Sequence, residues 1–159
     1  MAKALFPGTF DPVHLGHMRV IESASSIFDE LTVLLAINPH KTKRPMFTFE
    51  DRLQMLREST EGLGNVRCDR TDGEMAHYAT ERGCTVIVRG IRDAHDLAAE
   101  LALVEINRSL APQVTTIFFP QHSATSSTRI KELLELEKDI SALCPEPVAR
   151  RLRARRTSQ

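Results

Sequence analysis

Cysteine is scarce in this sequence, and its scarcity excludes two classes of protein. Only Cys68, Cys84 and Cys144 occur among the 159 residues, and no two of them form a C-x-x-C pair. Neither a disulfide framework nor a zinc site is therefore expected, and no protein metal site is predicted. Free thiols suit a reducing compartment, which indicates the cytoplasm.

Net charge and long apolar runs are also lacking. The chain has 21 Lys and Arg against 21 Asp and Glu, whereas nucleic-acid-binding proteins usually carry a basic excess. The longest apolar runs, such as Val33–Ile37, are far too short to cross a bilayer, and no signal-peptide pattern precedes the first predicted strand. We therefore expect a cytoplasmic protein with small-molecule substrates, no nucleic-acid partner and no membrane association.

Short apolar runs alternate with amphipathic stretches along the chain. Runs that are apolar throughout are typical of strands buried on both faces of a parallel sheet. The predicted strands are Ala2–Phe6, Leu31–Ile37, Asn65–Cys68, Thr85–Val88 and Val114–Phe119, and the predicted helices are Leu15–Phe28, Phe49–Thr60, Glu74–Arg82, Ala94–Leu110 and Ser127–Asp139. We predict a single α/β domain over residues 1–159, Rossmann-like, with a five-stranded parallel sheet and helices on both faces. Functional residues are then expected at the carboxyl ends of the strands.

The end of the chain has a different composition. Pro145 and Pro147 begin a new segment, and residues 148–156 contain five arginines. A nucleic-acid patch is one interpretation of this charge. We favour a solvated terminal helix, with residues 148–159 helical or frayed.

The longest motif runs from Phe6 to His17, after the first strand and into the first helix. Gly8 permits a turn that a residue with a Cβ would resist. Gly16 lets a phosphate approach the helix N-terminus, whose N–H groups attract anions, and His17 is placed to donate to a phosphate oxygen. His14 and His17 are also spaced to hold a metal, which we disfavour because no third ligand is obvious nearby.

This run, G-T-F-D-P-x-H-x-G-H, resembles the signature of the HxGH nucleotidyltransferase superfamily. The resemblance implies transfer of a nucleotidyl group from a nucleoside triphosphate. It identifies the superfamily better than it identifies the acceptor substrate.

A basic residue follows the second predicted strand. Lys41, in the run Asn-Pro-His-Lys, is placed to reach a phosphate as a point charge. Lys43 and Arg44 compete for the same role, and a solvated loop lysine is the alternative.

Two arginines follow the fourth predicted strand, on either side of Gly90. Arg89 and Arg92 are placed to converge on one anion, which an arginine binds in a bidentate manner. Surface ion pairs with Asp93 or Asp96 are the alternative.

Hydroxyl residues open the last predicted helix, in the run Ser126-Ser127-Thr128. Such residues cap a helix or bind a phosphate at its N-terminus. Capping alone is the commoner role, so both interpretations stay open.

The order of these motifs is similar to that of the phosphopantetheine adenylyltransferase family. The similarity rests on R-G-I-R, on Glu100, on the later N-R-x-L-x-P helix end and on the Ser-Ser element. It implies adenylyl transfer from ATP to 4′-phosphopantetheine, Mg²⁺ bound with ATP, and a homohexamer. One alternative is a nicotinate-mononucleotide adenylyltransferase, which shares the H-x-G-H element but not the Arg89–Pro112 stretch. Another HxGH nucleotidyltransferase and a nucleotide-binding regulator without catalysis are the others.

The resemblance also implies roles for single residues. The catalytic residues it implies are His17, Lys41 and Arg92. The ATP-binding residues it implies are Thr9, Phe10, His17, Gly90, Ile91, Arg92, Glu100, His122, Ser123, Ala124, Thr125, Ser126, Ser127 and Thr128. The residues it implies for the acceptor are Thr9, Lys41, Glu74, Met75 and Arg89. This chain departs from the family at His14, where Thr is frequent, at Glu74, where an apolar residue is usual, and in the short segment 121–125.

Overall fold

The computed structural model describes residues 1–37, 45–121 and 125–157. Five parallel strands form one sheet in the order β3-β2-β1-β4-β5. The strands are β1 (Lys3–Gly8), β2 (Glu30–Ala36), β3 (Val66–Thr71), β4 (Val86–Ile91) and β5 (Thr115–Pro120). The helices are α1 (Leu15–Ser25), α2 (Phe49–Thr60), α3 (Met75–Glu81), α4 (Ala94–Leu110), α5 (Ser127–Glu135) and α6 (Glu146–Thr157), with a short 3₁₀ helix η1 (Ser141–Leu143). The predicted fold class is confirmed.

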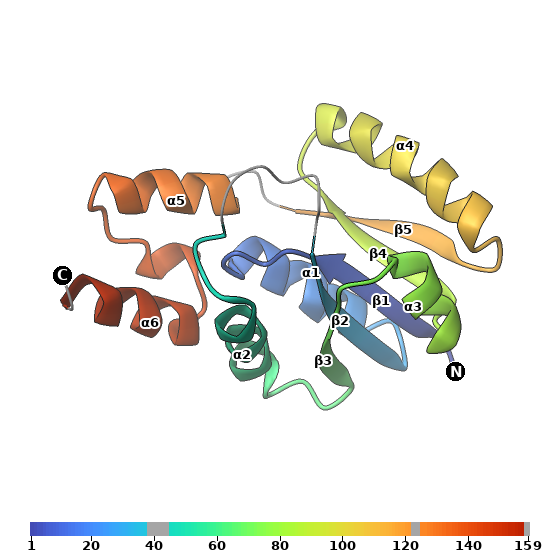
Figure 1. The fold of residues 1–159 in the computed structure, drawn as a ribbon, viewed down its shortest axis with the longest axis horizontal. Helices are drawn as coiled ribbons and strands as arrows, with labels where there is room; N and C mark the ends of the chain where they lie inside the picture. Colours follow the sequence, from blue (N-terminus) through green and yellow to red (C-terminus); the bar gives the residue numbers. More distant parts are fainter. Residues whose placement is uncertain (38–44, 122–124, 158–159) are drawn as a thin grey trace.

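The order in which the chain adds strands to the sheet reverses between β1 and β4. The chain runs outward from β1 to β3 and then returns to the other side of β1 to continue through β4 and β5. At such a point the crossovers leave the sheet on opposite faces, and a crevice opens at the carboxyl ends of the two strands. Figure 1 shows α3 and α4 away from α2, α5 and α6, with the sheet between the two groups.

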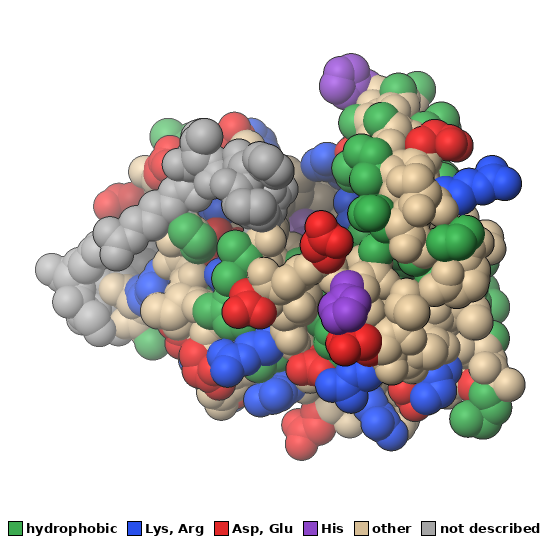
Figure 2. All heavy atoms as spheres, turned by 45° about the vertical axis from the view of Figure 1, so that its right-hand side comes forward, with side chains coloured by type: hydrophobic (Ala, Val, Ile, Leu, Met, Phe, Trp, Pro, Cys, Tyr) green, Lys and Arg blue, Asp and Glu red, His purple; other side chains and the backbone are tan. Residues whose placement is uncertain are grey.

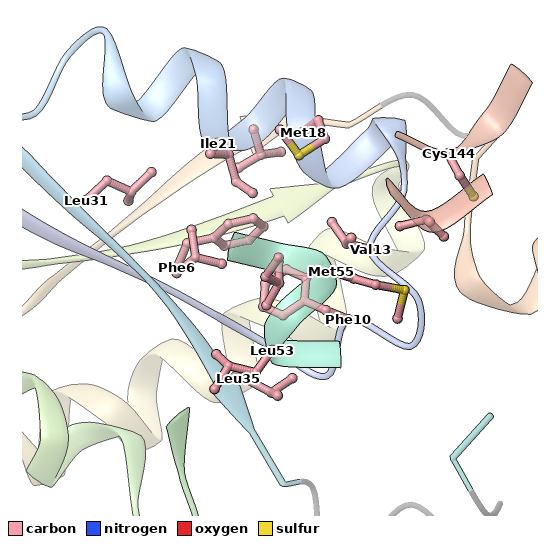
Figure 3. Packing of buried hydrophobic residues seen from close by; sticks show 14 of the residues in the cluster. Phe6, Phe10, Val13, Met18, Ile21, Leu31, Leu35, Leu53, Met55 and Cys144 are labelled. Atoms are coloured by element: carbon pink, nitrogen blue, oxygen red, sulfur yellow. The ribbon is translucent and has the colours of Figure 1, made fainter. Parts of the chain in front are cut away.

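Each face of the sheet buries its own hydrophobic cluster. Because successive side chains of a strand point to opposite faces, Phe6 joins one cluster and Leu5 the other. The larger cluster joins the sheet to α1, α2, α5 and α6, and Figure 3 shows Phe6 and Phe10 among side chains such as Ile21 and Met55. The smaller cluster lies under α3, through Ala76 and Ala79 and the partly buried Met75 and Tyr78.

Two predicted helices are shorter than expected. Residues 15–28 were predicted as one helix, but α1 ends at Ser25. Residues 127–139 were predicted as another, but α5 ends at Glu135. Glu137 adopts a left-handed φ of 53°, and the N–H groups of Glu137 and Lys138 bond back to Leu134 and Leu133. This pattern is a Schellman C-cap, which usually contains glycine, so the sequence carries no stop signal there.

Residues 148–159 were predicted to be helical or frayed and solvated. The helix is confirmed as far as Thr157, but the expectation that it is solvated is wrong. Val148, Ala149 and Leu152 of α6 are buried, because the helix packs against α2. Arg150 and Arg151 both form ion pairs with Glu58 of α2. These arginines therefore stabilise the packing of α6 against α2. Among the described residues, no helix has the length and apolar character needed to span a membrane.

Candidate functional site

A cavity of about 430 Å³ lies where β1 and β4 end. Its walls come from the β1–α1 loop, the start of α1, the ends of β2 and β4, the start of α3, one side of α4 and the start of α5. The predicted site residues that line this cleft are Thr9, Phe10, His17, Met75, Arg89, Gly90, Arg92, Glu100, Ser126, Ser127 and Thr128. Parts of the chain up to 119 residues apart are thus brought to one edge of the sheet, as the parallel strands predict.

Some predicted residues lie elsewhere. Glu74 is exposed at the N-cap of α3, Thr125 is buried, and neither Glu74, Ile91 nor Thr125 lines the cleft. Lys41, with its competitors Lys43 and Arg44, and His122, Ser123 and Ala124 lie outside the described residues.

His14 and His17 form a reciprocal pair at the start of α1. The N–H of His17 donates to Nδ1 of His14 at 3.3 Å, and the N–H of His14 donates to Nδ1 of His17 at 3.2 Å. The rings stack with their centroids 3.6 Å apart. This arrangement is a capping box built from two histidines, and it satisfies two of the N–H groups that a helix start leaves unpaired.

The capping box fixes the tautomer of both rings. A nitrogen that accepts a hydrogen bond carries no proton, so each neutral ring holds its proton on Nε2. His17 lines the cleft and is therefore an Nε2–H donor of fixed orientation. The role of His14, which the sequence left open, is to hold His17. The described residues contain no cluster of three His, Cys, Asp or Glu side chains that could hold a metal ion with them.

Phe10 packs against the His17 ring. Its side chain is buried, and its ring meets that of His17 edge to face at 4.9 Å. Phe10 also adopts a left-handed φ of 41°, which reverses the chain after β1. A Cβ on Gly8 would lie 2.9 Å from the Phe10 ring, so Gly8 is needed here for close packing. Its φ is not left-handed, and the turn depends on the backbone of Phe10 instead.

Acid should weaken this capping box. Burial and the nearby charge of Arg92 lower the pKa of His14 to about 4, against about 6.5 in an unfolded chain. The unfolded chain therefore binds a proton first, and stability falls as pH drops from about 6.5 to about 4, by up to about 3 kcal/mol. We expect thermal unfolding midpoints measured across this range to show the loss.

The variant His14→Asn provides the control for this pH effect. Asparagine is a good N-cap that does not titrate in this range, so its unfolding midpoint should depend less on pH. An acid dependence equal to that of the wild-type chain would assign the effect to other groups.

Arg89 is held rigidly. Its Nε and Nη2 donate to the two carboxylate oxygens of Glu100 at 2.6 Å each, and its Nη1 donates to the carbonyl of Pro7 at 3.3 Å. Glu100, predicted to contact ATP, thus uses both oxygens to orient Arg89.

Arg92 is held more loosely. Its Nε and Nη2 lie 3.4 Å from the carboxylate of Asp96, one helical turn further along the chain. The alternative of an Arg92–Asp96 ion pair is thus realised, yet both side chains still line the cleft. Exposed pairs of this length contribute little free energy, so a phosphate can take the place of Asp96.

Gln121 is a cleft residue that the sequence did not reveal. A Cβ on Gly16 would lie 2.8 Å from its Nε2, and a Cβ on Gly90 would lie 2.8 Å from its Oε1. Its amide therefore lies between the start of α1 and the end of β4, and both glycines leave it that room. Its position directly after β5 was the available signal.

The start of α5 forms another wall of the cleft. The Oγ of Ser126 accepts from the N–H of Arg129 at 3.0 Å, so this serine is the N-cap. Ser127 and Thr128 follow in the first turn and line the cleft with it. Capping and a lining position are both realised, and the helix N-terminus offers N–H groups to an anion.

Comparisons with known proteins agree with this geometry. Residues 5–133 match the model of the cytidylyltransferase-like family. A phosphopantetheine adenylyltransferase from Synechococcus sp. strain JA-2-3B'a(2-13) is 43% identical over 155 residues, covering 96% of each chain. One from Symbiobacterium thermophilum is 40% identical over 156 residues, covering 96% of this chain and 95% of its own. A crystal structure described as a nicotinate-nucleotide adenylyltransferase from Vibrio parahaemolyticus superposes with a TM-score of 0.69 at 26% identity, covering 96% of this chain and 99% of that one.

Proposed function

The chain belongs to the phosphopantetheine adenylyltransferases of the cytidylyltransferase-like family, and we propose that it transfers the adenylyl group of ATP to 4′-phosphopantetheine. The products are dephospho-coenzyme A and pyrophosphate, on the route to coenzyme A. The observation that carries this proposal is that His17, Arg89 and Arg92 share one cleft with the N-terminus of α5. Such a site gathers donors and positive charge around phosphates.

The reaction needs charge stabilisation more than proton transfer. The acceptor phosphate arrives as an anionic nucleophile, so no general base has to create it. Two anions must be held in line while charge develops on the α-phosphate and the leaving pyrophosphate. Nε2–H of His17, Arg92 and the start of α5 are placed to stabilise that charge, and Arg89 is placed to hold the acceptor phosphate. Lys41 remains a predicted contributor.

We propose that Mg²⁺ enters with ATP. The cleft offers two carboxylates, Asp96 and Glu100, and both are paired with arginines. ATP oxygens and water would therefore supply most of the ligands, as Mg²⁺ commonly accepts, and the ion would neutralise phosphate charge.

A pyrophosphate-release assay tests the acceptor. The purified protein, ATP and Mg²⁺ are incubated with 4′-phosphopantetheine or with nicotinate mononucleotide, the acceptor suggested by the structural neighbour. We expect release with the first and little with the second. Preference for nicotinate mononucleotide would overturn the assignment, and ATP binding without release under either condition would indicate a regulator.

We also propose that the chain assembles with itself, as a homohexamer. In the single chain α4 has no buried residue, and Leu103, Ile106 and Leu110 on it are 45%, 54% and 56% exposed. Figure 2 shows hydrophobic side chains along the ridge that α4 forms at the upper right. An apolar helix face of this kind is typical of a subunit interface.

Charge on this α4 face should dissociate the assembly. We expect Leu103→Glu with Ile106→Glu to lower the molar mass measured by light scattering to that of smaller species. Leu136→Glu is the matched control, because Leu136 is 66% exposed and lies after α5. Dissociation by the control alone, or a monomeric wild-type protein, would contradict the proposed interface.

A cytoplasmic location completes the proposal. Cys68, Cys84 and Cys144 are all free thiols, and burial raises the pKa of Cys144 to about 12. Such thiols persist in a reducing compartment.

A further inference from the structure

Asp11 contacts three segments that lie far apart in the sequence. Its side chain is buried. Oδ2 accepts the N–H of Met46 at 2.8 Å and the ammonium of Lys131 at 2.7 Å, and Oδ1 accepts the N–H of Phe47 at 3.0 Å. These partners are 35, 120 and 36 residues away. One carboxylate therefore joins the β1–α1 loop to the segment before α2 and to α5.

Two of the joined segments, the β1–α1 loop and the start of α5, both contribute residues to the lining of the cleft. Thr9 and Phe10, which precede Asp11, line it from the β1 side. Lys131 lies one turn after the cleft-lining start of α5. A second contact ties the same walls together, because Oγ of Ser127 donates to the carbonyl of Pro12 at 3.4 Å.

The segment of Met46 and Phe47 is itself anchored by α6, and α2 is tied directly to the β1–α1 loop. Buried Arg52 of α2 donates from Nη1 to the carbonyl of Thr9 at 2.9 Å. Arg155 of α6 donates to the carbonyl of Met46 at 2.9 Å, and its guanidinium lies 4.4 Å from the centre of the Phe47 ring. Residues 46 and 47 thus give Asp11 a fixed base.

The charge of Asp11 suits this role. Burial acts to raise the pKa of its carboxyl, but hydrogen bonds from Lys131, Met46 and Phe47 outweigh burial and hold the pKa below its ordinary value. An ionised carboxylate only accepts hydrogen bonds, and all three partners of Asp11 are donors.

We propose that Asp11 is a positioning residue, which fixes the β1–α1 loop and the start of α5 relative to each other so that the two reacting phosphates meet in line. This proposal rests on the proposed adenylyl transfer. Catalytic groups need support of this kind, because a misplacement of 1 Å can cost about a hundredfold in rate.

Two variants test the role of Asp11. Asp11→Asn keeps one acceptor oxygen but directs an NH₂ group at donors, so it breaks part of the junction. Lys131→Met keeps the stem of Lys131 and removes only its link to Asp11. Asp29→Asn is the matched control, because Oδ2 of Asp29 also accepts a backbone N–H, that of Ala2 at 2.7 Å. Asp29 lies just before β2, at the amino ends of the strands and therefore away from the cleft.

We expect Asp11→Asn to lower kcat/KM about tenfold at 25 °C, a fraction of the loss that full misplacement causes. Lys131→Met should raise the KM and the Kd for ATP about threefold and leave the KM for the acceptor nearly unchanged. The double variant should be no worse than Asp11→Asn, because the two groups act through one contact. The control should match the wild type.

Thermal unfolding of every variant separates positioning from stability. A lower unfolding midpoint for Asp11→Asn with wild-type kcat and KM for the folded protein would overturn the proposal. The proposal would also be overturned if the losses in kcat/KM of Lys131→Met and Asp11→Asn added in full in the double variant. If Asp11→Asn does not fold, the Lys131→Met variant still tests the proposal. An unchanged Kd for ATP in that variant would then overturn the proposal by itself.

Failure of the proposed adenylyl transfer can be distinguished from failure of the role proposed for Asp11. A wild-type protein that releases no pyrophosphate with 4′-phosphopantetheine refutes the acceptor. Calorimetric titration of ATP into the wild-type and Lys131→Met proteins still tests whether the Asp11 junction shapes the nucleotide site.

Discussion

Replacement of His17 by alanine should lower kcat about a hundredfold, the order expected for one lost transition-state donor. The capping box holds Nε2–H of this ring ready at the cleft, so the donor needs no reorganisation when charge develops. The KM values should change less than kcat, because the interaction strengthens as the transition state forms. Steady-state kinetics of pyrophosphate release measures both.

The same substitution has a smaller structural cost. It removes the Nδ1 acceptor for the N–H of His14, which should lower the free energy of unfolding by about 1 kcal/mol. His77→Ala is the matched control, since His77 is an exposed residue of α3 that pairs with Glu81. Wild-type turnover in a folded His17→Ala protein would refute the assigned role.

The sheet and the cleft were predictable because their signals are local. Five apolar runs separated by amphipathic stretches lead to five parallel strands. Gly8 at the end of β1 and the arginines at the end of β4 then line one cleft. The predicted end of β4 was sufficient to place Arg89, Gly90 and Arg92 at the cleft.

What the sequence could not show depends on partners distant along the chain or on unusual chemistry. Histidine is a rare N-cap, so the role of His14 is visible only when its ring is seen against His17. Glu137 replaces the usual glycine of a C-cap. The burial of α6 depends on α2, about 90 residues earlier, through pairs such as Arg150 with Glu58.

The largest combined effect on stability and activity is expected at Arg89. Arg89→Met should lower kcat/KM for 4′-phosphopantetheine about a hundredfold, equivalent to about 2.7 kcal/mol, because a rigid bidentate donor for the acceptor phosphate is lost. The same change leaves the half-buried carboxylate of Glu100 without its partner. An unpaired buried charge is costly, so we expect a further loss of about 1–3 kcal/mol in the free energy of unfolding.

The two losses at Arg89 should separate in a double variant. Arg89→Met with Glu100→Gln removes the unpaired charge and should regain most of the stability, measured by urea denaturation, while the lowered kcat/KM for the acceptor remains. Arg92→Met is the control, because its partner Asp96 is held at 3.4 Å; it should reduce kcat with little change in stability. If the double variant recovered acceptor affinity along with stability, Arg89 would be a structural residue, and the phosphate would have to be bound by other cations of the cleft.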